Sequence, residues 1–197
     1  GSLVARRLAE EKNEKVLLIE KRGHIGGNAY DYYNNDGILV HKYGPHIFHT
    51  NNKDVWDYMS RFTEWRLYQH RVLAYVDGQL VPLPINLDTI NKLFGTNYTS
   101  DTISSFYDKA RVNKIIQNSE DIVISKVGIE LYEKFFKNYT KKQWGVYPDQ
   151  LDSEVTARIP VRINRDSRYF TDKYQGLPKY GYTKMFEKIL DHSNISI

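Results

Sequence analysis

The order of the first twenty residues constrains the fold of this chain more than any other feature. Residues 2–12 carry apolar side chains along one stripe, which predicts a helix that begins directly after Gly1. Residues 16–19 form a continuous apolar run that ends in Glu20. Such a run is typical of a parallel strand that is buried on both faces. A helix that leads into a parallel strand is part of a βαβ unit, so an α/β fold is predicted.

Two residues indicate that this unit binds a dinucleotide. In the fingerprint G-x-G-x-x-G, the last glycine lets the helix pack closely on the first strand. An acidic residue about twenty positions later binds ribose hydroxyls. Gly1 stands where that glycine is expected, and Glu20 follows nineteen positions later. We therefore expect an incomplete Rossmann-like domain whose first strand precedes this sequence, the alternative being a cloning remnant followed by a surface helix.

The loop after Glu20 favours FAD over NAD. It runs through Lys21 to the pair Gly26-Gly27 and then Asn28. In FAD enzymes of the amine-oxidase-like group, a strand-end acid followed by paired glycines is a recurrent second fingerprint. Paired glycines let backbone N–H groups reach a pyrophosphate without obstruction by side chains. The expected FAD-binding residues here are Gly1, Glu20, Lys21, Gly26, Gly27 and Asn28.

After residue 71 the predicted secondary structure changes from a hairpin to helices and then to extended chain. Asp77-Gly78 is a type I′ turn signal that predicts a β-hairpin of residues 72–76 and 79–83. The pattern is helical from residue 86 to about 144 and extended after residue 151. We therefore expect four stretches: a Rossmann-like FAD-binding part (1–71), a hairpin belonging to an antiparallel sheet region (72–85), an inserted helical subdomain (86–150), and a sheet region returning to the FAD domain (151–197).

Composition excludes several kinds of chemistry. The chain has no cysteine, so disulfides, thiolate nucleophiles and zinc–thiolate sites are ruled out. Three histidines, His41, His46 and His49, lie close in sequence, but no carboxylate or cysteine completes a metal site, so none is expected. The net charge of +4 is dispersed without a basic block, which argues against nucleic acid. No apolar run approaches the roughly eighteen residues of a membrane span.

Five stretches, in this order, closely resemble the bacterial UDP-galactopyranose mutase family. They are residues 24–30 (HIGGNAY), 41–51 (HKYGPHIFHTN), 139–145 (YTKKQWG), 158–162 (RIPVR) and 169–176 (YFTDKYQG). The resemblance implies interconversion of UDP-galactopyranose and UDP-galactofuranose by reduced FAD without net redox change. Flavin N5 attacks the anomeric carbon while UDP leaves and later returns. No protein nucleophile is apparent in the sequence, which agrees with chemistry performed by a cofactor.

The resemblance also implies the catalytic residues. Arg158 would grip the diphosphate and stabilise UDP as leaving group, because a guanidinium matches phosphate geometry. Arg162, four residues later, could be a second functional arginine or a surface one. His46 and His49, with Gly44, would form a loop held against the flavin ring.

A substrate pocket is implied at the end of the helical subdomain. Tyr139 would stack on uracil, Trp144 would flank the sugar and diphosphate, and Tyr169 would place its hydroxyl on the diphosphate. His70 stands near a position where some members carry asparagine, which puts its sugar contact in doubt. The full expected substrate set is His70, Phe135, Tyr139, Thr140, Trp144, Arg158 and Tyr169.

Further expectations from the resemblance are a homodimer, a cytoplasmic location, and a missing C-terminal part that leaves residues 1–197 alone inactive. Two alternatives remain. A FAD-dependent oxidoreductase of the amine-oxidase-like group would share Glu20 and Gly26-Gly27, but has no need of Arg158 or the aromatic pocket. A non-enzymatic protein that binds glycan or nucleic acid through a basic, aromatic surface would use the 16 tyrosines without a cofactor.

Overall fold

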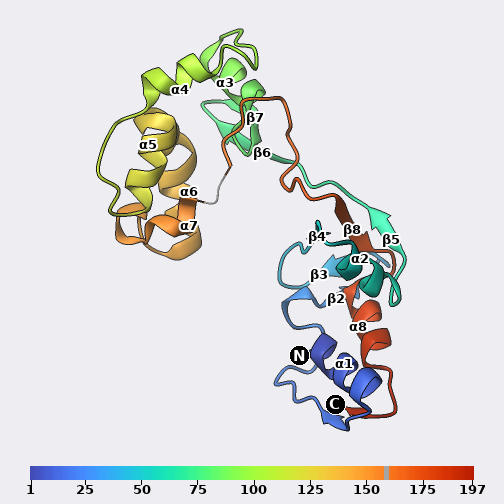
Figure 1. The fold of residues 1–197 in the computed structure, drawn as a ribbon. Helices are drawn as coiled ribbons and strands as arrows, with labels where there is room; N and C mark the ends of the chain where they lie inside the picture. Colours follow the sequence, from blue (N-terminus) through green and yellow to red (C-terminus); the bar gives the residue numbers. More distant parts are fainter. Residues whose placement is uncertain (158–159) are drawn as a thin grey trace. The chain divides into compact units, whose positions relative to one another are not determined.

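The chain folds into two compact units. The computed structural model describes residues 1–157 and 160–197, with side chains described for 1–156 and 160–197. The first unit comprises residues 1–69 and 170–197, and the second comprises residues 70–169, as Figure 1 shows. None of the helices in the described part of the chain has the length and apolar character of a membrane span.

The predicted start of the chain is confirmed as a helix followed by a strand. Helix α1 (Ser2–Lys12) begins directly after its N-cap Gly1. Strand β1 (Val16–Leu17) pairs in parallel with β9 (Ile195–Ser196). The prediction of a strand buried on both faces is wrong, since Leu17 is 69% exposed and Ile19 is 87% exposed. Among the described residues, β9 and α1 shield β1, and its other side stays open to solvent.

The rest of the first unit is built from short antiparallel strands and two helices. Strand β2 (Asp31–Tyr33) pairs with β3 (Leu39–His41). A three-stranded sheet has the order β4 (Phe48–Thr50), β8 (Tyr174–Pro178), β5 (Trp65–Leu67). A 3-10 turn η1 (Gly27–Ala29) and helices α2 (Lys53–Ser60) and α8 (Tyr182–Leu190) complete it. The core of this unit consists of Met59, Phe62, Tyr182, Met185 and Ile189.

The second unit begins with the predicted hairpin, which the structure confirms. Strands β6 (Val72–Val76) and β7 (Gln79–Leu83) are antiparallel, and Val76 pairs with Gln79. The two turn residues have positive φ angles, 47° at Asp77 and 77° at Gly78. A type I′ turn requires this conformation, so the dipeptide fixes the register of the hairpin.

The helical region is confirmed with shifted boundaries. Its elements are α3 (Leu87–Phe94), α4 (Ser104–Ala110), α5 (Ser119–Leu131), the π turn η2 (Tyr132–Lys137), α6 (Asn138–Trp144), a 3-10 turn η3 (Pro148–Gln150) and α7 (Ser153–Ala157). Asn86 and Thr89 form a capping box that starts α3. Extended chain is expected after residue 151, but α7 forms there because the Asp152 carboxylate accepts from Glu154 N at 2.9 Å.

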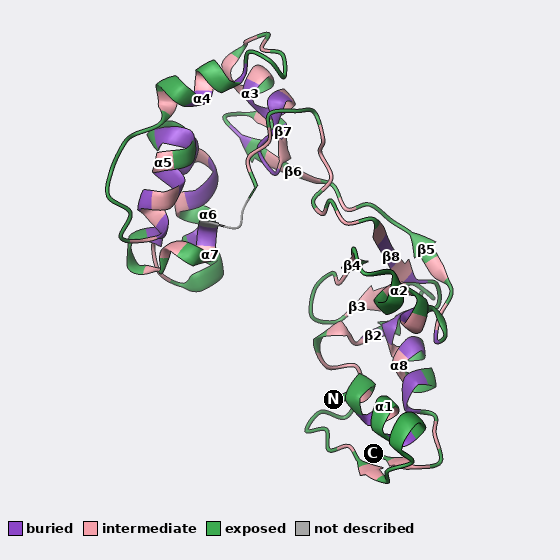
Figure 2. Cartoon of the chain, in the orientation of Figure 1, coloured by how far each residue is buried: buried purple, intermediate pink, exposed green. Residues whose placement is uncertain are grey.

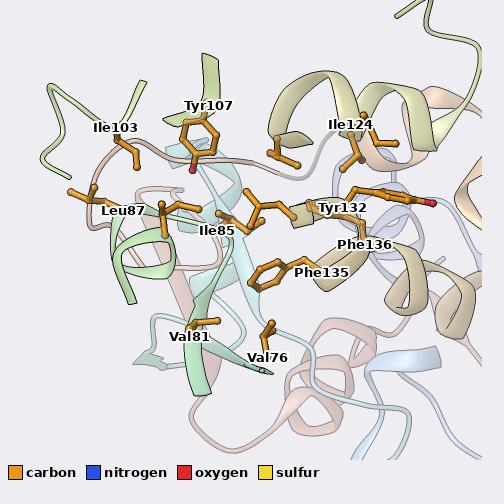
Figure 3. Close-up of a cluster of buried hydrophobic side chains, with 14 residues drawn as sticks. Val76, Val81, Ile85, Leu87, Ile103, Tyr107, Ile124, Tyr132, Phe135 and Phe136 are labelled. Atoms are coloured by element: carbon orange, nitrogen blue, oxygen red, sulfur yellow. The ribbon is translucent and has the colours of Figure 1, made fainter. Parts of the chain in front are cut away.

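One hydrophobic core joins the hairpin to these helices (Figure 3). Figure 2 shows buried positions concentrated along α5 and the turn that follows it. The members of this core that Figure 3 labels are Val76, Val81, Ile85, Leu87, Ile103, Tyr107, Ile124, Tyr132, Phe135 and Phe136. Burial of each large aliphatic side chain stabilises such a core by about 1.5–3 kcal/mol. The hairpin and the helices of the second unit are therefore held in fixed positions by one shared core.

Candidate functional site

A cavity in the second unit gathers residues from three segments. It measures about 340 Å³ and is lined by Tyr139, Thr140, Gln143, Trp144, Val155, Thr156 and Tyr169. Tyr139 and Gln143 share one face of α6, because residues four apart are neighbours on a helix, and Trp144 is the last residue of that helix. Helix α7 contributes Val155 and Thr156, and Tyr169 comes from the later segment.

The walls of this cavity combine open aromatic faces with a buried support. Tyr139 is 51% exposed and Trp144 is 53% exposed, whereas Thr140 is buried. The Thr156 hydroxyl donates to the backbone oxygen of Ser119 at 3.0 Å, which ties α7 to the start of α5. Exposed aromatic rings on a fixed frame are suited to stacking against a flat ligand such as a nucleobase.

Tyr169 is held beside His70. The Tyr169 N–H donates to the His70 backbone oxygen at 2.7 Å. The two rings meet edge to face, with centroids 5.7 Å apart. The segment that precedes the hairpin is therefore paired with the segment that contains Tyr169, and Tyr169 in turn lines the cavity.

The structure brings together part of the substrate set expected from the sequence. Tyr139, Thr140, Trp144 and Tyr169 line the cavity, and His70 contacts Tyr169. Phe135 lies in the hydrophobic core with 8% of its surface exposed, and is not among the lining residues. Arg158 lies outside the described residues.

The sequence analysis did not identify Gln143, Val155 and Thr156 as lining residues. Gln143 could have been found from its position four residues after Tyr139, on the same helical face. Val155 and Thr156 reach the cavity through the packing of α7 against α5, which no local pattern encodes.

The first unit presents a second, separate group of residues around Glu20. The Glu20 carboxylate accepts from the backbone N–H of Arg22 at 2.9 Å, and this hydrogen bond lowers the pKa of Glu20. A cavity of about 370 Å³ is lined by Leu17, Leu18, Ile19, Glu20, Arg22, Gly23, His24, Ile25 and Ile197. An ionised carboxylate at the end of a strand, beside a cavity, can accept hydrogen bonds from ribose hydroxyls.

The paired glycines after Glu20 have backbone conformations that favour glycine. The φ angle is 87° at Gly26 and 56° at Gly27. A Cβ on Gly27 would meet nothing within 4 Å, so the backbone there is open to a ligand. Arg22 braces the loop through Asn28, whose side-chain oxygen accepts from its guanidinium at 2.8 Å. The exposed acid and the open glycine backbone fit a dinucleotide. Lys21 is exposed nearby, and a Cβ on Gly1 would lie 3.4 Å from Leu18.

The two histidines expected beside the flavin each use one ring nitrogen within the protein. His46 Nδ1 lies 2.9 Å from the backbone oxygen of Gly44. His49 Nδ1 lies 2.8 Å from Asp172 Oδ2, and its ring stacks on Phe170 at 3.7 Å. Among the described residues, no group of three or more potential ligands could hold a metal ion.

Comparison with known families gives two matches within the chain. Residues 134–197 match the family model described as UDP-galactopyranose mutase. Residues 1–62 match an NAD(P)-binding Rossmann-like domain. The α/β, Rossmann-like fold class predicted from the sequence is therefore confirmed.

Similar proteins cover the whole chain. A probable UDP-galactopyranose mutase of Klebsiella pneumoniae is 46% identical over 100% of the chain and 52% of its own length. A dTDP-fucopyranose mutase of Escherichia coli is 44% identical over 99% of the chain and 52% of its own length. A crystal structure of reduced UDP-galactopyranose mutase has the same fold, with a TM-score of 0.70 at 18% identity, over 100% of the chain and 46% of that structure. The chain thus spans about half the length of the curated relatives it matches, and over that half its resemblance to UDP-galactopyranose mutase is confirmed.

Proposed function

We propose that this protein interconverts UDP-galactopyranose and UDP-galactofuranose with reduced FAD as its cofactor. The observation that carries the proposal is the cavity in which Tyr139, Trp144 and Tyr169 meet. These three residues lie within the stretch that matches the mutase family model. The open aromatic rings are suited to a nucleobase, and the tyrosine hydroxyl is suited to a phosphate oxygen.

In this proposal the second unit binds the nucleotide sugar. Tyr139 stacks on the uracil, Trp144 flanks the sugar and diphosphate, and Thr140 contributes to the same wall. Tyr169 donates its hydroxyl to the diphosphate, beside His70. Arg158 grips the diphosphate and neutralises the charge that develops as UDP departs.

The first unit holds the cofactor in this proposal. Glu20 accepts hydrogen bonds from ribose hydroxyls, and the backbone of Gly26 and Gly27 faces the pyrophosphate, supported by the exposed acid and open glycine loop. The loop from Gly44 to His49 lies beside the isoalloxazine ring, and Gly1, Lys21 and Asn28 complete the site. When bound, reduced FAD supplies N5 as the nucleophile for the anomeric carbon.

Turnover of UDP-galactofuranose by the dithionite-reduced full-length protein tests the proposal. Formation of UDP-galactopyranose is expected, with no reductant consumed per turnover. Arg158→Ala should abolish turnover while FAD stays bound, and Arg165→Ala, which removes an exposed arginine paired with Asp88, should not. No product under reducing conditions would contradict the proposal. Net flavin reduction by a substrate would instead favour an oxidoreductase of the amine-oxidase-like group.

A second candidate substrate follows from the Escherichia coli relative, which is named a dTDP-fucopyranose mutase and is almost as similar to this chain. The same cavity could accept thymine, because an aromatic stack tolerates any base. Offering both nucleotide sugars in competition separates the candidates, and the substrate with the larger kcat/KM is the one the site is built for.

A homodimer and a cytoplasmic location complete the proposal. Both rest on the resemblance to the family. Sedimentation of the full-length protein at two concentrations tests the oligomeric state, and a monomer at both would contradict it.

A further inference from the structure

Arg162 is an arginine whose donors point at the backbone of its own loop. Its side chain is only 10% exposed. Nη1 donates to the backbone oxygen of Asp166 at 2.8 Å and also to that of Arg168. Nη2 lies 3.5 Å from the backbone oxygen of Tyr169. One guanidinium therefore contacts three carbonyls of the segment that leads to the cavity.

The base of this arrangement is fixed to the hydrophobic core. The Arg162 N–H donates to the Ile85 oxygen at 2.9 Å, and the Leu87 N–H donates to the Asn164 oxygen at 3.0 Å. Ile85 is 1% exposed and Leu87 is 2% exposed. Since these two residues are immobilised by packing, the backbone on which Arg162 stands is held firmly relative to the core.

The charge of Arg162 is balanced within the same loop. The Asp166 carboxylate lies 3.9 Å from Arg162 Nη1 and accepts from Arg168 Nη2 at 2.8 Å. Asp166 is itself held by a turn, because its N–H donates to the Asn164 side chain at 3.0 Å. The result is a loop wrapped around a guanidinium, with Tyr169 at its far end.

We propose that Arg162 is a positioning residue that holds Tyr169 in place for the diphosphate of the substrate. It does so through the loop carbonyls, and it is not among the residues that line the cavity. This inference rests on the proposed function, in which Tyr169 contacts that diphosphate. It also gives the two arginines of the 158–162 stretch different tasks, one on the substrate and one on the protein.

Arginine is the side chain this arrangement requires. A guanidinium offers five donors in a rigid plane, so it can reach several carbonyls at once. A lysine ammonium is a compact charge on a flexible stem and reaches fewer of them. Arg162→Lys should therefore keep the positive charge but lose some of the contacts with the loop carbonyls that position Tyr169. Arg162→Met should lose all of these contacts.

The test is a double-mutant cycle on UDP binding, measured calorimetrically with the full-length protein. Arg162→Met should weaken binding of UDP about ten- to a hundredfold, because a displaced binding group loses most of its contact. The same change in a Tyr169→Phe background should cost much less, since Arg162 acts through that hydroxyl. Arg165→Met is the matched control, an exposed arginine of the same loop, and should leave UDP binding unchanged.

Three results would decide against the inference. Additive losses in the cycle, or unchanged binding in Arg162→Met, would show that Arg162 does not act through Tyr169. If Arg162→Met fails to fold, Arg162→Lys takes its place in the cycle under the same criteria. Failure of the wild-type protein to bind UDP would overturn the proposed function and this inference together, whereas the other results leave the proposed function standing.

Discussion

The carboxylate of Asp31 accepts a hydrogen bond of 2.6 Å from the backbone N–H of Tyr182 and so caps the first turn of α8. Its other oxygen accepts from the Thr183 N–H at 2.8 Å, and the Thr183 hydroxyl donates to the Asp31 backbone oxygen at 2.7 Å. Asp31 is 3% exposed. This buried cap joins β2 to a helix far away in sequence and holds the two parts of the first unit together.

Asp31→Asn should destabilise the first unit, because an amide nitrogen would replace one of the two acceptors that face backbone N–H groups. We expect a loss of about 1–3 kcal/mol in the free energy of unfolding, measured by urea denaturation. Asp36→Asn, which alters an exposed aspartate, is the control and should change stability by less than about 0.5 kcal/mol. Equal effects of the two changes would contradict the capping role.

Gly128→Ala should disrupt the second unit. Gly128 has a φ angle of 84° and breaks the helical geometry of α5, and a Cβ there would lie 2.3 Å from the backbone oxygen of Ala110. We expect the free energy of unfolding to fall by about 2–4 kcal/mol, measured by thermal or urea denaturation. Gly37 also has a positive φ angle, but an added Cβ there would meet no atom within 4 Å. Gly37→Ala should therefore lower the free energy of unfolding by only about 1 kcal/mol. Similar losses for both would show that the close approach to Ala110 is unimportant.

Gly27→Ala should weaken FAD binding more than it weakens the fold. Its Cβ meets no protein atom within 4 Å, so the added methyl group would occupy the space proposed for the pyrophosphate. We expect the FAD dissociation constant of the full-length protein to rise by about tenfold or more, measured by flavin titration. Gly37→Ala serves again as the control for a positive φ angle alone. Unchanged FAD affinity in Gly27→Ala would argue against a pyrophosphate at this loop.

Trp144→Ala should reduce nucleotide binding with little effect on stability, because the indole is half exposed and faces the cavity. Loss of one aromatic stack corresponds to an increase of about five- to a hundredfold in the dissociation constant of UDP. Tyr75→Ala removes an aromatic ring that is 74% exposed on β6, outside the cavity, and should leave UDP binding unchanged. If both variants bind UDP as the wild type does, the cavity is not the nucleotide site.

Asp166 should make the second unit lose stability in acid. The hydrogen bonds from Arg168 lower the pKa of Asp166 to about 2, from 3.8. A lowered carboxyl pKa contributes stability that is present above the unfolded value and is lost as the pH falls towards about 2. The gap in unfolding free energy between the wild type and Asp166→Asn should therefore shrink between pH 5 and pH 2, by about 2 kcal/mol or less. Arg168→Met should flatten this pH dependence, and a gap that does not depend on pH would contradict the assignment.

The sequence predicted best what short stretches encode. The Asp77-Gly78 dipeptide requires the backbone angles of a type I′ turn, so the hairpin and its register follow from two residues. The helix after Gly1 likewise follows from its apolar stripe. By contrast, the open side of β1 depends on which elements cover it, and Ile19 carries no local sign of its exposure.

The placement of Phe135 shows how an irregular turn changes a site. In an unbroken α-helix, Phe135 and Tyr139 are four residues apart and would share a face. The π turn from Tyr132 to Lys137 widens the helix there and shifts the faces that follow. Phe135 consequently packs in the core, while Tyr139 faces the cavity. Sequence periodicity assumes a regular helix, so it could not separate the two.

The pairing of His70 with Tyr169 makes the second unit a self-contained insertion. The chain enters this unit at His70 and leaves it at Tyr169, and one backbone hydrogen bond joins these two residues. Next to them, Arg71 and Arg168 form an isolated antiparallel β-bridge. A short glycine–serine linker is therefore long enough to replace the whole of residues 70–169. Protein engineering can accordingly exchange residues 70–169, the proposed nucleotide-sugar module, without rethreading the first unit, which is the proposed dinucleotide-binding part.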